Sequence, residues 1–251
     1  MSILVEEFHK SYGDTVAVRG ISFEVPAGTI LGLVGPNGAG KTTTMRALAG
    51  ILEPTRGQLE VDGHDLARDP IAAKAALAYV PDDPKLFEHL TVWEHMQFIA
   101  AAYRQTDWKA RAEELIGQFE LGEKRDSACS DLSRGMRQKV AICCAYLHEP
   151  RAIMFDEPLT GLDPYGIRTI KDSIRKRAAA GAAIMVSSHL LSLVEDLCTA
   201  VLVLHKGRQM LHATMAELRA QAVADGRHET LEELFFRLTT ETGVPVAEVA
   251  P

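Results

Sequence analysis

Short apolar runs that end in polar residues recur along the chain, and they predict buried β-strands. The run TILGLV ends at Gly35, the run AIMF ends at Asp156 and Glu157, and the run AAIMV ends at two serines and His189. In parallel α/β sheets, ligands bind outside the carboxyl ends of the strands. We therefore expect these polar residues to lie together along one edge of one sheet.

Apolar residues at helical spacing predict helices between the strands. Thr91 followed by Glu94 fits a capping box, and Asp107 and Asp163 can each cap a later helix. The segment from about residue 84 to residue 147 is mainly helical, so we expect a helical insertion in an α/β protein. Its first helix is predicted to bury a stripe of apolar side chains, namely Trp93, Met96, Ile99 and Tyr103.

The chain's 251 residues suffice for one large domain or two small ones. A shift to more polar sequence near Thr214 divides it into a predicted domain, residues 1–213, and a helical tail, residues 214–251, with one amphipathic stretch, TLEELFFRLTTE. No apolar run reaches the roughly 18–20 residues that a membrane span needs, and no signal peptide is visible at the N-terminus. These features predict a cytoplasmic protein.

The charge and cysteine content exclude several classes of function. The formal net charge is −7 and there is no Lys/Arg tract, so direct binding to nucleic acid or to an anionic membrane surface is not expected as the main function. The cysteines include no C-x-x-C pair, which makes a metal site or a disulfide framework a poor interpretation. Buried, reduced thiols are expected at Cys129, Cys143, Cys144 and Cys198.

The stretch GPNGAGKT, from Gly35 to Thr42, fits the phosphate-binding pattern G-x-x-x-x-G-K-[ST] after a predicted strand and before a predicted helix. Glycines allow backbone N–H groups to close around phosphates, and the helix N-terminus adds a partial positive charge. Lys41 would reach the β- and γ-phosphates, and Thr42 would ligate Mg²⁺. The alternative is a purely structural glycine turn.

The acids after the second strand are candidates for catalysis in such a site. Asp156 would hold Mg²⁺ through water, and Glu157 would polarise the attacking water as a general base. His189, after the third strand, would contact the γ-phosphate or that water. The alternatives are a solvated loop acid for Glu157 and a structural histidine for His189.

With these residues in place, the chain resembles the ATP-binding cassette (ABC) ATPase family. The resemblance covers Ile3–Arg208 and includes FHKSYG, GPNGAGKTT, YVPDDP, LSRGMRQK, IMFDEPLTGLDP and VSSHLLSLVEDLC. It implies a P-loop NTPase fold with a RecA-like parallel-sheet core, an N-terminal antiparallel β-subdomain and an inserted α-helical subdomain at about residues 84–147. It also implies ATP and Mg²⁺ as ligands.

The resemblance assigns further roles by position. Glu157 and His189 would be catalytic, Tyr12 would stack on adenine, and Asp163 would lie in the D-loop at a dimer interface. The signature stretch would complete an ATP site in a second cassette, so a homodimer is implied; its residues are Ser133, Arg134, Gly135 and Met136. The implied ATP-binding set is Tyr12, Val18, Gly35, Asn37, Gly38, Ala39, Gly40, Lys41, Thr42 and Thr43.

Elementary chemistry supports the role of the signature stretch. Ser133 can act as an N-cap, and Gly135 leaves the first helical turn open for close approach of a backbone or an anion. Alone, an ordinary capped helix would be the better interpretation.

Three positions depart from the commonest family pattern. Arg134 stands where glycine is usual, Met136 where glutamine is usual, and Asp82 where the Q-loop has glutamine. We expect Asp82 to contact Mg²⁺ directly or through water, to sense Mg-ATP and to relay closure.

With one cassette, the chain is expected to be the ATP-hydrolysing subunit of an ABC transporter, peripheral at the cytoplasmic face of the membrane. A separate permease subunit would dock near Asp82–Trp93, with apolar contacts from Leu86 and Phe87. YVPDDPKLFEHLTVWEHM, LSRGMRQK and LEELFFRLT resemble type-2 exporters. The alternative is a soluble ABC ATPase acting on ribosomes or DNA, but the double cassettes or long coiled-coil insertions typical of those proteins are not seen here.

Overall fold

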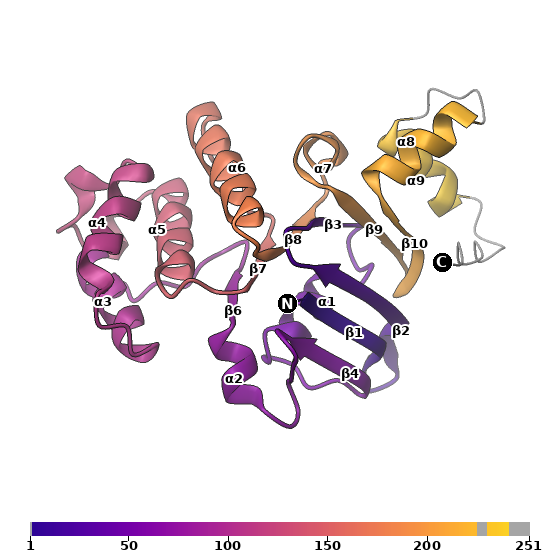
Figure 1. The fold of residues 1–251 in the computed structure, drawn as a ribbon, viewed down its shortest axis with the longest axis horizontal. Coiled ribbons are helices and arrows are strands. Elements are labelled where there is room, and N and C mark those ends of the chain that lie inside the picture. Colours follow the sequence, from indigo (N-terminus) through magenta and orange to yellow (C-terminus); the bar gives the residue numbers. More distant parts are fainter. Residues whose placement is uncertain (1, 225–229, 241–251) are drawn as a thin grey trace.

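The computed structural model describes residues 2–224 and 230–240, which form two β-sheets and the helices around them (Figure 1). The smaller sheet is antiparallel, in the order β2-β1-β4-β5. Its strands are β1 (Ser2–Tyr12), β2 (Thr15–Pro26), β4 (Arg56–Val61) and β5 (His64–Asp65).

The larger sheet has the order β10-β9-β3-β8-β7-β6, and all its neighbouring strands are parallel except β9 and β10. Its parallel strands are buried along their length, which explains their continuous apolar sequences, whereas β2 alternates and buries mainly one face. The strands of this sheet are β3 (Ile30–Val34), β6 (Leu77–Val80), β7 (Ala152–Asp156), β8 (Ala183–Ser188), β9 (Ala200–His205) and β10 (Arg208–Thr214).

The larger sheet separates two hydrophobic cores, and successive residues of one strand enter different cores. In β7, Ile153 and Phe155 pack into the core on the side of the helices, while Met154 packs into the core shared with the small sheet. The helical core includes residues of α3 (Val92–Ala102), α4 (Trp108–Gln118), α5 (Arg134–Leu147), α6 (Pro164–Ala179) and α7 (Leu191–Leu197). The other core includes α1 (Lys41–Leu48) and one residue of α2 (Pro70–Ala75).

The helical insertion predicted between the strands is present as α3, α4 and α5, which lie together beyond β6 (Figure 1). The predicted capping box of Thr91 and Glu94 is confirmed. Asp107 is at the N-cap position of α4, but its side chain makes no capping hydrogen bond. The predicted buried stripe of α3 is only partly correct: Met96 is fully buried, while Trp93, Ile99 and Tyr103 are half-buried. Ile99 and Tyr103 border a cavity.

β10 ends at Thr214, and α8 (Met215–Ala224) starts at the next residue, so the predicted domain boundary falls at the junction of these two elements, to within a residue, and stays a prediction. The amphipathic stretch forms α9 (Leu231–Thr240), whose Leu231 and Leu238 are buried in the helical core. Residues 225–229 and 241–251 of the predicted tail lie outside the described residues. Within the described ranges, no helix has the length and apolar character that would let it cross a bilayer.

Candidate functional site

The three strands predicted to end in reactive residues are neighbours in the sheet. β3, β8 and β7 are parallel and adjacent, with Val34 opposite Ser188 and Asp156 opposite Ser187. Their carboxyl ends therefore share one edge, from which the glycine loop, Glu157 and His189 follow directly. The predicted convergence at one sheet edge is confirmed.

The glycine loop encloses the ammonium group of Lys41. Its Nζ donates to the carbonyl oxygen of Gly35 at 2.6 Å and to that of Pro36 at 3.3 Å. Burial lowers the pKa of Lys41, and the negative charges of Glu157 and Asp156 oppose that shift. Gly40 has φ +106° immediately before α1, a conformation that other residues rarely adopt. The loop thus combines a helix N-terminus with a held cation, which is suited to binding phosphate.

Two hydroxyl groups from the flanking strands hold the buried carboxylate of Asp156. Ser187, directly opposite on β8, donates to Oδ1, and Tyr79 on β6 donates to Oδ2 at 3.3 Å. Tyr79 pairs with Met154, two positions before Asp156, so the tyrosine and the aspartate share one face of the sheet. Burial and the charge of Asp156 raise the pKa of Tyr79 to about 12, so its hydroxyl stays protonated and able to donate.

Tyr79 is a site residue that sequence reasoning missed. Its only local signal is its place as the first letter of YVPDDP. Its contact with Asp156 depends on which strands are neighbours, which the sequence pattern does not reveal.

Glu157 and His189 meet at the end of β7 and β8. His189 Nδ1 lies 2.9 Å from Glu157 Oε2, and the side chain of Glu157 is 20% exposed whereas that of His189 is 60% exposed. Glu157 has φ +50°, a left-handed conformation that costs on the order of 1–3 kcal/mol for a residue with a side chain. Its N–H donates to Ser187, which helps to maintain that conformation. The pair presents a carboxylate and an imidazole that can orient and deprotonate water.

The signature stretch begins α5, which packs against β6 at the far edge of the sheet from β10. Ser133 is the predicted N-cap and accepts from the N–H of Met136 at 3.2 Å. A Cβ atom on Gly135 would lie 3.1 Å from Cδ2 of Leu162 and 3.4 Å from the carbonyl oxygen of Gly161. The start of the helix is therefore packed closely against the segment before α6.

The other residues predicted to bind ATP, and Asp163, differ in burial and in their contacts. Val18 is fully buried beneath the glycine loop, while Tyr12, at the end of β1, is 47% exposed with Lys10 Nζ 5.1 Å from its ring centroid. Asp163 caps α6 by accepting from the N–H of Gly166 at 2.8 Å, so its role at a dimer interface stays a prediction. In the loop and the first turn of α1, Ala39 is buried, Thr43 is half-buried, and Asn37, Gly38 and Thr42 are exposed.

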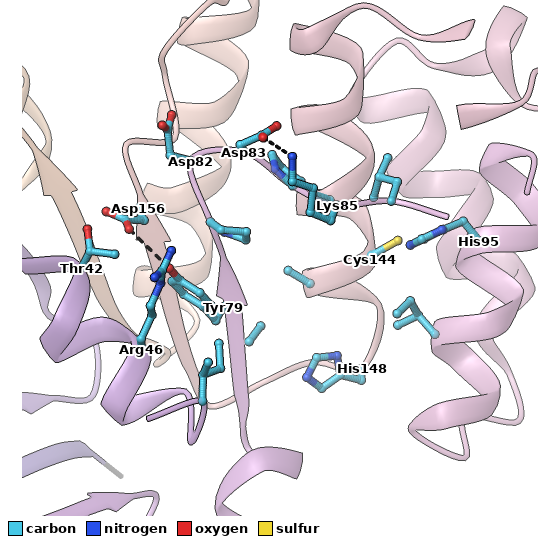
Figure 2. A pocket seen from close by; sticks show the side chains of 18 of the residues that line it. Thr42, Arg46, Tyr79, Asp82, Asp83, Lys85, His95, Cys144, His148 and Asp156 are labelled. Atoms are coloured by element: carbon cyan, nitrogen blue, oxygen red, sulfur yellow. Dashed lines mark hydrogen bonds and ion pairs between the residues drawn. The ribbon is translucent and has the colours of Figure 1, made fainter. Parts of the chain in front are cut away.

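A cavity of about 840 Å³ lies between the parallel sheet and the helical insertion. Thr42, Tyr79 and Asp156 line one part of it, and His95, Cys144 and His148 line another (Figure 2). Tyr103 also lines the cavity. Burial lowers the pKa of both His95 and His148, which favours their neutral forms. Asp82 also borders the cavity, but its Oδ1 contacts Nη2 of Arg134 at 2.9 Å.

The donors at this edge suit Mg²⁺ better than a softer metal. An exposed hydroxyl, Thr42, and a fixed carboxylate, Asp156, line the same cavity. Mg²⁺ prefers oxygen ligands and is usually held by one or two protein groups, substrate phosphates and water. Among the described residues there is no cluster of three or more His, Cys, Asp or Glu that could hold a metal.

Comparison with known proteins decides the family. The family model described as ABC transporter matches residues 18–160. The chain belongs to the ABC transporter family. The ABC-type transporter ATP-binding protein EcsA of Bacillus subtilis (strain 168) is 34% identical to it, over 96% of this chain and 98% of that protein.

Other relatives of this ABC transporter chain agree. The bacitracin transport ATP-binding protein BcrA of Enterococcus faecalis is 34% identical, over 86% of this chain and 70% of that protein. A solved structure described as the ATP binding subunit of an ABC transporter superposes with a TM-score of 0.89 at 34% identity, covering 95% of this chain and 99% of that one.

These findings confirm the predicted fold, a P-loop ABC cassette. They also confirm the predicted activity: the chain is an ATP-binding subunit of an ABC transporter, an ATPase whose reaction is coupled to transport. The relatives give no support to the alternative of a soluble ABC ATPase acting on ribosomes or DNA.

Proposed function

We propose that this subunit powers export by closing as a dimer of two cassettes around ATP, beneath a separate membrane permease. The observation that carries the proposal is the contact of Glu157 with His189, 2.9 Å apart, at the same sheet edge as the phosphate loop. Relatives named for daunorubicin resistance, Nod factor export and bacitracin transport support export as the direction.

Within one cassette, the amides of the glycine loop and Lys41 bind the phosphate chain, while Tyr12 and Val18 lie on the side of the adenosine. Thr42 and Asp156 would hold Mg²⁺, which would supply positive charge to neutralise the phosphates. Glu157 accepts a proton from the attacking water as the water oxygen bonds to the γ-phosphorus and the bond to ADP breaks. His189 orients Glu157 and the water. Positioning and charge stabilisation supply most of the catalysis.

The site is completed by a second copy of the chain. Ser133 and Gly135 of one subunit face the γ-phosphate held by the other, through the capped start of α5. This part of the proposal is supported by the place of α5 at the margin of the sheet, whereas α1 follows the central strand β3. Half of each site then comes from the partner, so a separated chain should be a poor ATPase.

The cavity beside the helical insertion is the proposed docking place of the permease. Phe87, within the predicted docking segment Asp82–Trp93, is 53% exposed and packs edge-on against Phe98. Its exposed ring and the aromatic wall of the cavity suit an apolar segment of the membrane partner. Docking there would hold the subunit peripherally at the cytoplasmic face of the membrane.

The test compares wild-type protein with Glu157→Gln. Loss of the general base should lower ATP turnover by about 100-fold or more, while ATP should convert the variant into a stable dimer in light scattering after gel filtration. Lys41→Ala, which weakens phosphate binding, should remain monomeric under the same conditions. Near wild-type turnover in Glu157→Gln would remove Glu157 as the base. A failure of that variant to dimerise with ATP would overturn the proposed mechanism.

A further inference from the structure

Two of the departures from the family pattern contact each other. Asp82, after β6, stands where glutamine is usual, and Arg134, at the start of α5, stands where glycine is usual. Asp82 Oδ1 and Arg134 Nη2 are 2.9 Å apart, and their side chains are 49% and 46% exposed. Because both groups remain half in water, the ion pair is weak enough to exchange partners.

Arg134 needs a negative partner because of its place on the helix. It is the first residue of α5, where the helix dipole already contributes positive charge, and the first turn has no acidic residue. Nη1 of Arg137 donates to the carbonyl oxygen of Leu132 at 2.7 Å. The neighbouring acid, Asp83, is paired with Lys85. Asp82 is therefore the carboxylate in direct contact with Arg134 at the start of the signature helix.

Packing fixes where Arg134 can reach. A Cβ atom built on Gly161 would lie 3.4 Å from Cδ of Arg134, so the arginine stem runs along the segment that leads to Asp163. Gly135, the next residue, is packed more closely still, with a Cβ built on it 3.1 Å from Cδ2 of Leu162. The stem of Arg134 therefore lies next to Ser133 and Gly135, the groups that the proposed function places at the γ-phosphate of a second cassette.

Asp82 lies near a second group of residues besides Arg134. It borders the same cavity as Thr42 and Asp156, yet in the view of Figure 2 its carboxylate points away from both. One carboxylate thus lies between the edge that would hold Mg-ATP in its own chain and the signature helix that would serve the ATP of another chain.

We propose that Asp82 and the triphosphate of the ATP bound by a second cassette compete for Arg134. The proposal rests on the proposed dimer. A carboxylate and a polyphosphate repel each other, so the approach of the phosphate weakens the contact of Asp82 with the half-exposed guanidinium, and the more highly charged phosphate takes its place. Closure then opens the Asp82–Arg134 pair, brings Arg134 to the phosphate and releases Asp82. In a separated cassette, Asp82 screens the signature from other anions.

A double-mutant cycle on dimerisation tests the competition without measuring activity. In the Glu157→Gln background, the full chain is saturated with Mg-ATP, and the monomer–dimer dissociation constant is measured by analytical ultracentrifugation. The same is done with Asp82→Asn, with Arg134→Gln and with both changes. Separate roles of either residue cancel in the cycle, leaving the contribution of the pair.

The sign of the coupling decides the result. If closure opens the pair, breaking it costs free energy on dimerisation. Each single change removes this cost, but the double variant can remove it only once. The double variant should therefore dimerise more weakly than the product of the single effects predicts, by about 2- to 25-fold, since a symmetric dimer opens two pairs worth a factor of about 1.4 to 5 each. Asp83→Asn combined with Arg134→Gln is the matched control: Asp83 lies in the field of Arg134 but is paired with Lys85, so its coupling to Arg134 should be smaller than that of Asp82.

The other outcomes overturn the proposal in distinguishable ways. Independent effects of the two changes would mean that the pair is equally present before and after closure. Coupling of the opposite sign would mean that the pair stabilises the closed dimer. If the Glu157→Gln parent does not dimerise with ATP at all, the proposed function fails first, and the competition fails with it.

Discussion

Two aspartates border the same cavity, and the structure treats them in opposite ways. Asp156 is 5% exposed, ends a central strand and accepts hydrogen bonds from hydroxyl groups on both neighbouring strands. Asp82 follows an edge strand, is half exposed and contacts the guanidinium of Arg134. Neutral donors in a buried frame fix the direction of a carboxylate, whereas a solvated ion pair can be exchanged. The first arrangement suits a carboxylate that acts as a metal ligand. The second suits a carboxylate that changes its partner when the protein moves.

The largest expected effect comes from changing the fixed carboxylate. Asp156→Asn keeps the shape but removes the charge that faces Mg-ATP, so we expect ATP turnover to fall by about 100-fold or more. Steady-state phosphate release measures this loss. Asp82→Asn should cost far less under the same conditions, and equal losses in the two variants would contradict the distinction between them.

The next effect tests a hydroxyl group that holds Asp156 in place rather than Asp156 itself. Ser187→Ala removes the hydroxyl that donates to Oδ1 of Asp156, so it leaves that buried oxygen without this donor, while the N–H of Glu157 keeps the backbone oxygen of Ser187 as an acceptor. We expect a loss of about 1–3 kcal/mol in the free energy of unfolding, measured by urea denaturation, together with reduced turnover.

The matched control for this change is Ser188→Ala. Ser188 is also buried, but its hydroxyl accepts from the N–H of Leu190 and not from the catalytic residues. Turnover should therefore fall less in Ser188→Ala than in Ser187→Ala. The reverse order would show that the hydroxyl of Ser187 does not position Asp156.

A smaller effect is expected for Tyr79→Phe, which removes one weak hydrogen bond to Asp156 and leaves the ring in place. We predict that the Mg²⁺ concentration for half-maximal turnover rises by about two- to tenfold, the equivalent of roughly 0.5–1.5 kcal/mol. Nucleotide binding without Mg²⁺ should not change. Tyr103→Phe, in the same cavity wall but stacked on His148, should leave the Mg²⁺ dependence as it is.

The smallest effect concerns the stability contributed by the exchangeable pair. Asp82→Asn should change the free energy of unfolding of the separated chain by about 1 kcal/mol or less, because the pair is half in water. Raising the ionic strength should reduce that difference further. A loss of several kcal/mol in urea denaturation would mean that the pair is a structural support and not a movable contact.

The sequence predicted the features that a local pattern can carry. The apolar runs before Gly35 and Asp156 predict buried strands. Thr91, Ser133 and Asp163 can be recognised as helix caps from a few neighbouring residues. The edge shared by β3, β7 and β8 followed from the general behaviour of parallel sheets.

The features that could not be predicted from the sequence depend on contacts between distant segments. Tyr79 reaches Asp156 only because β6 and β7 pair in one register, and Asp82 reaches Arg134 only because α5 packs beside β6. The burial of α3 was partly mistaken for a related reason: helical spacing shows which residues share a face, but not that part of this face borders a cavity.

The alternation of β7 between the two cores has a consequence for any change in the length of this strand. Met154 enters one core, Phe155 enters the other, and Asp156 meets Ser187 at the next step. Deleting or inserting a single residue within β7 would exchange the faces of both apolar side chains and remove the carboxylate from its hydroxyl partner at the same time. One register thus determines the packing of both cores and the position of the acid, so indels within this strand should be much less tolerated than substitutions.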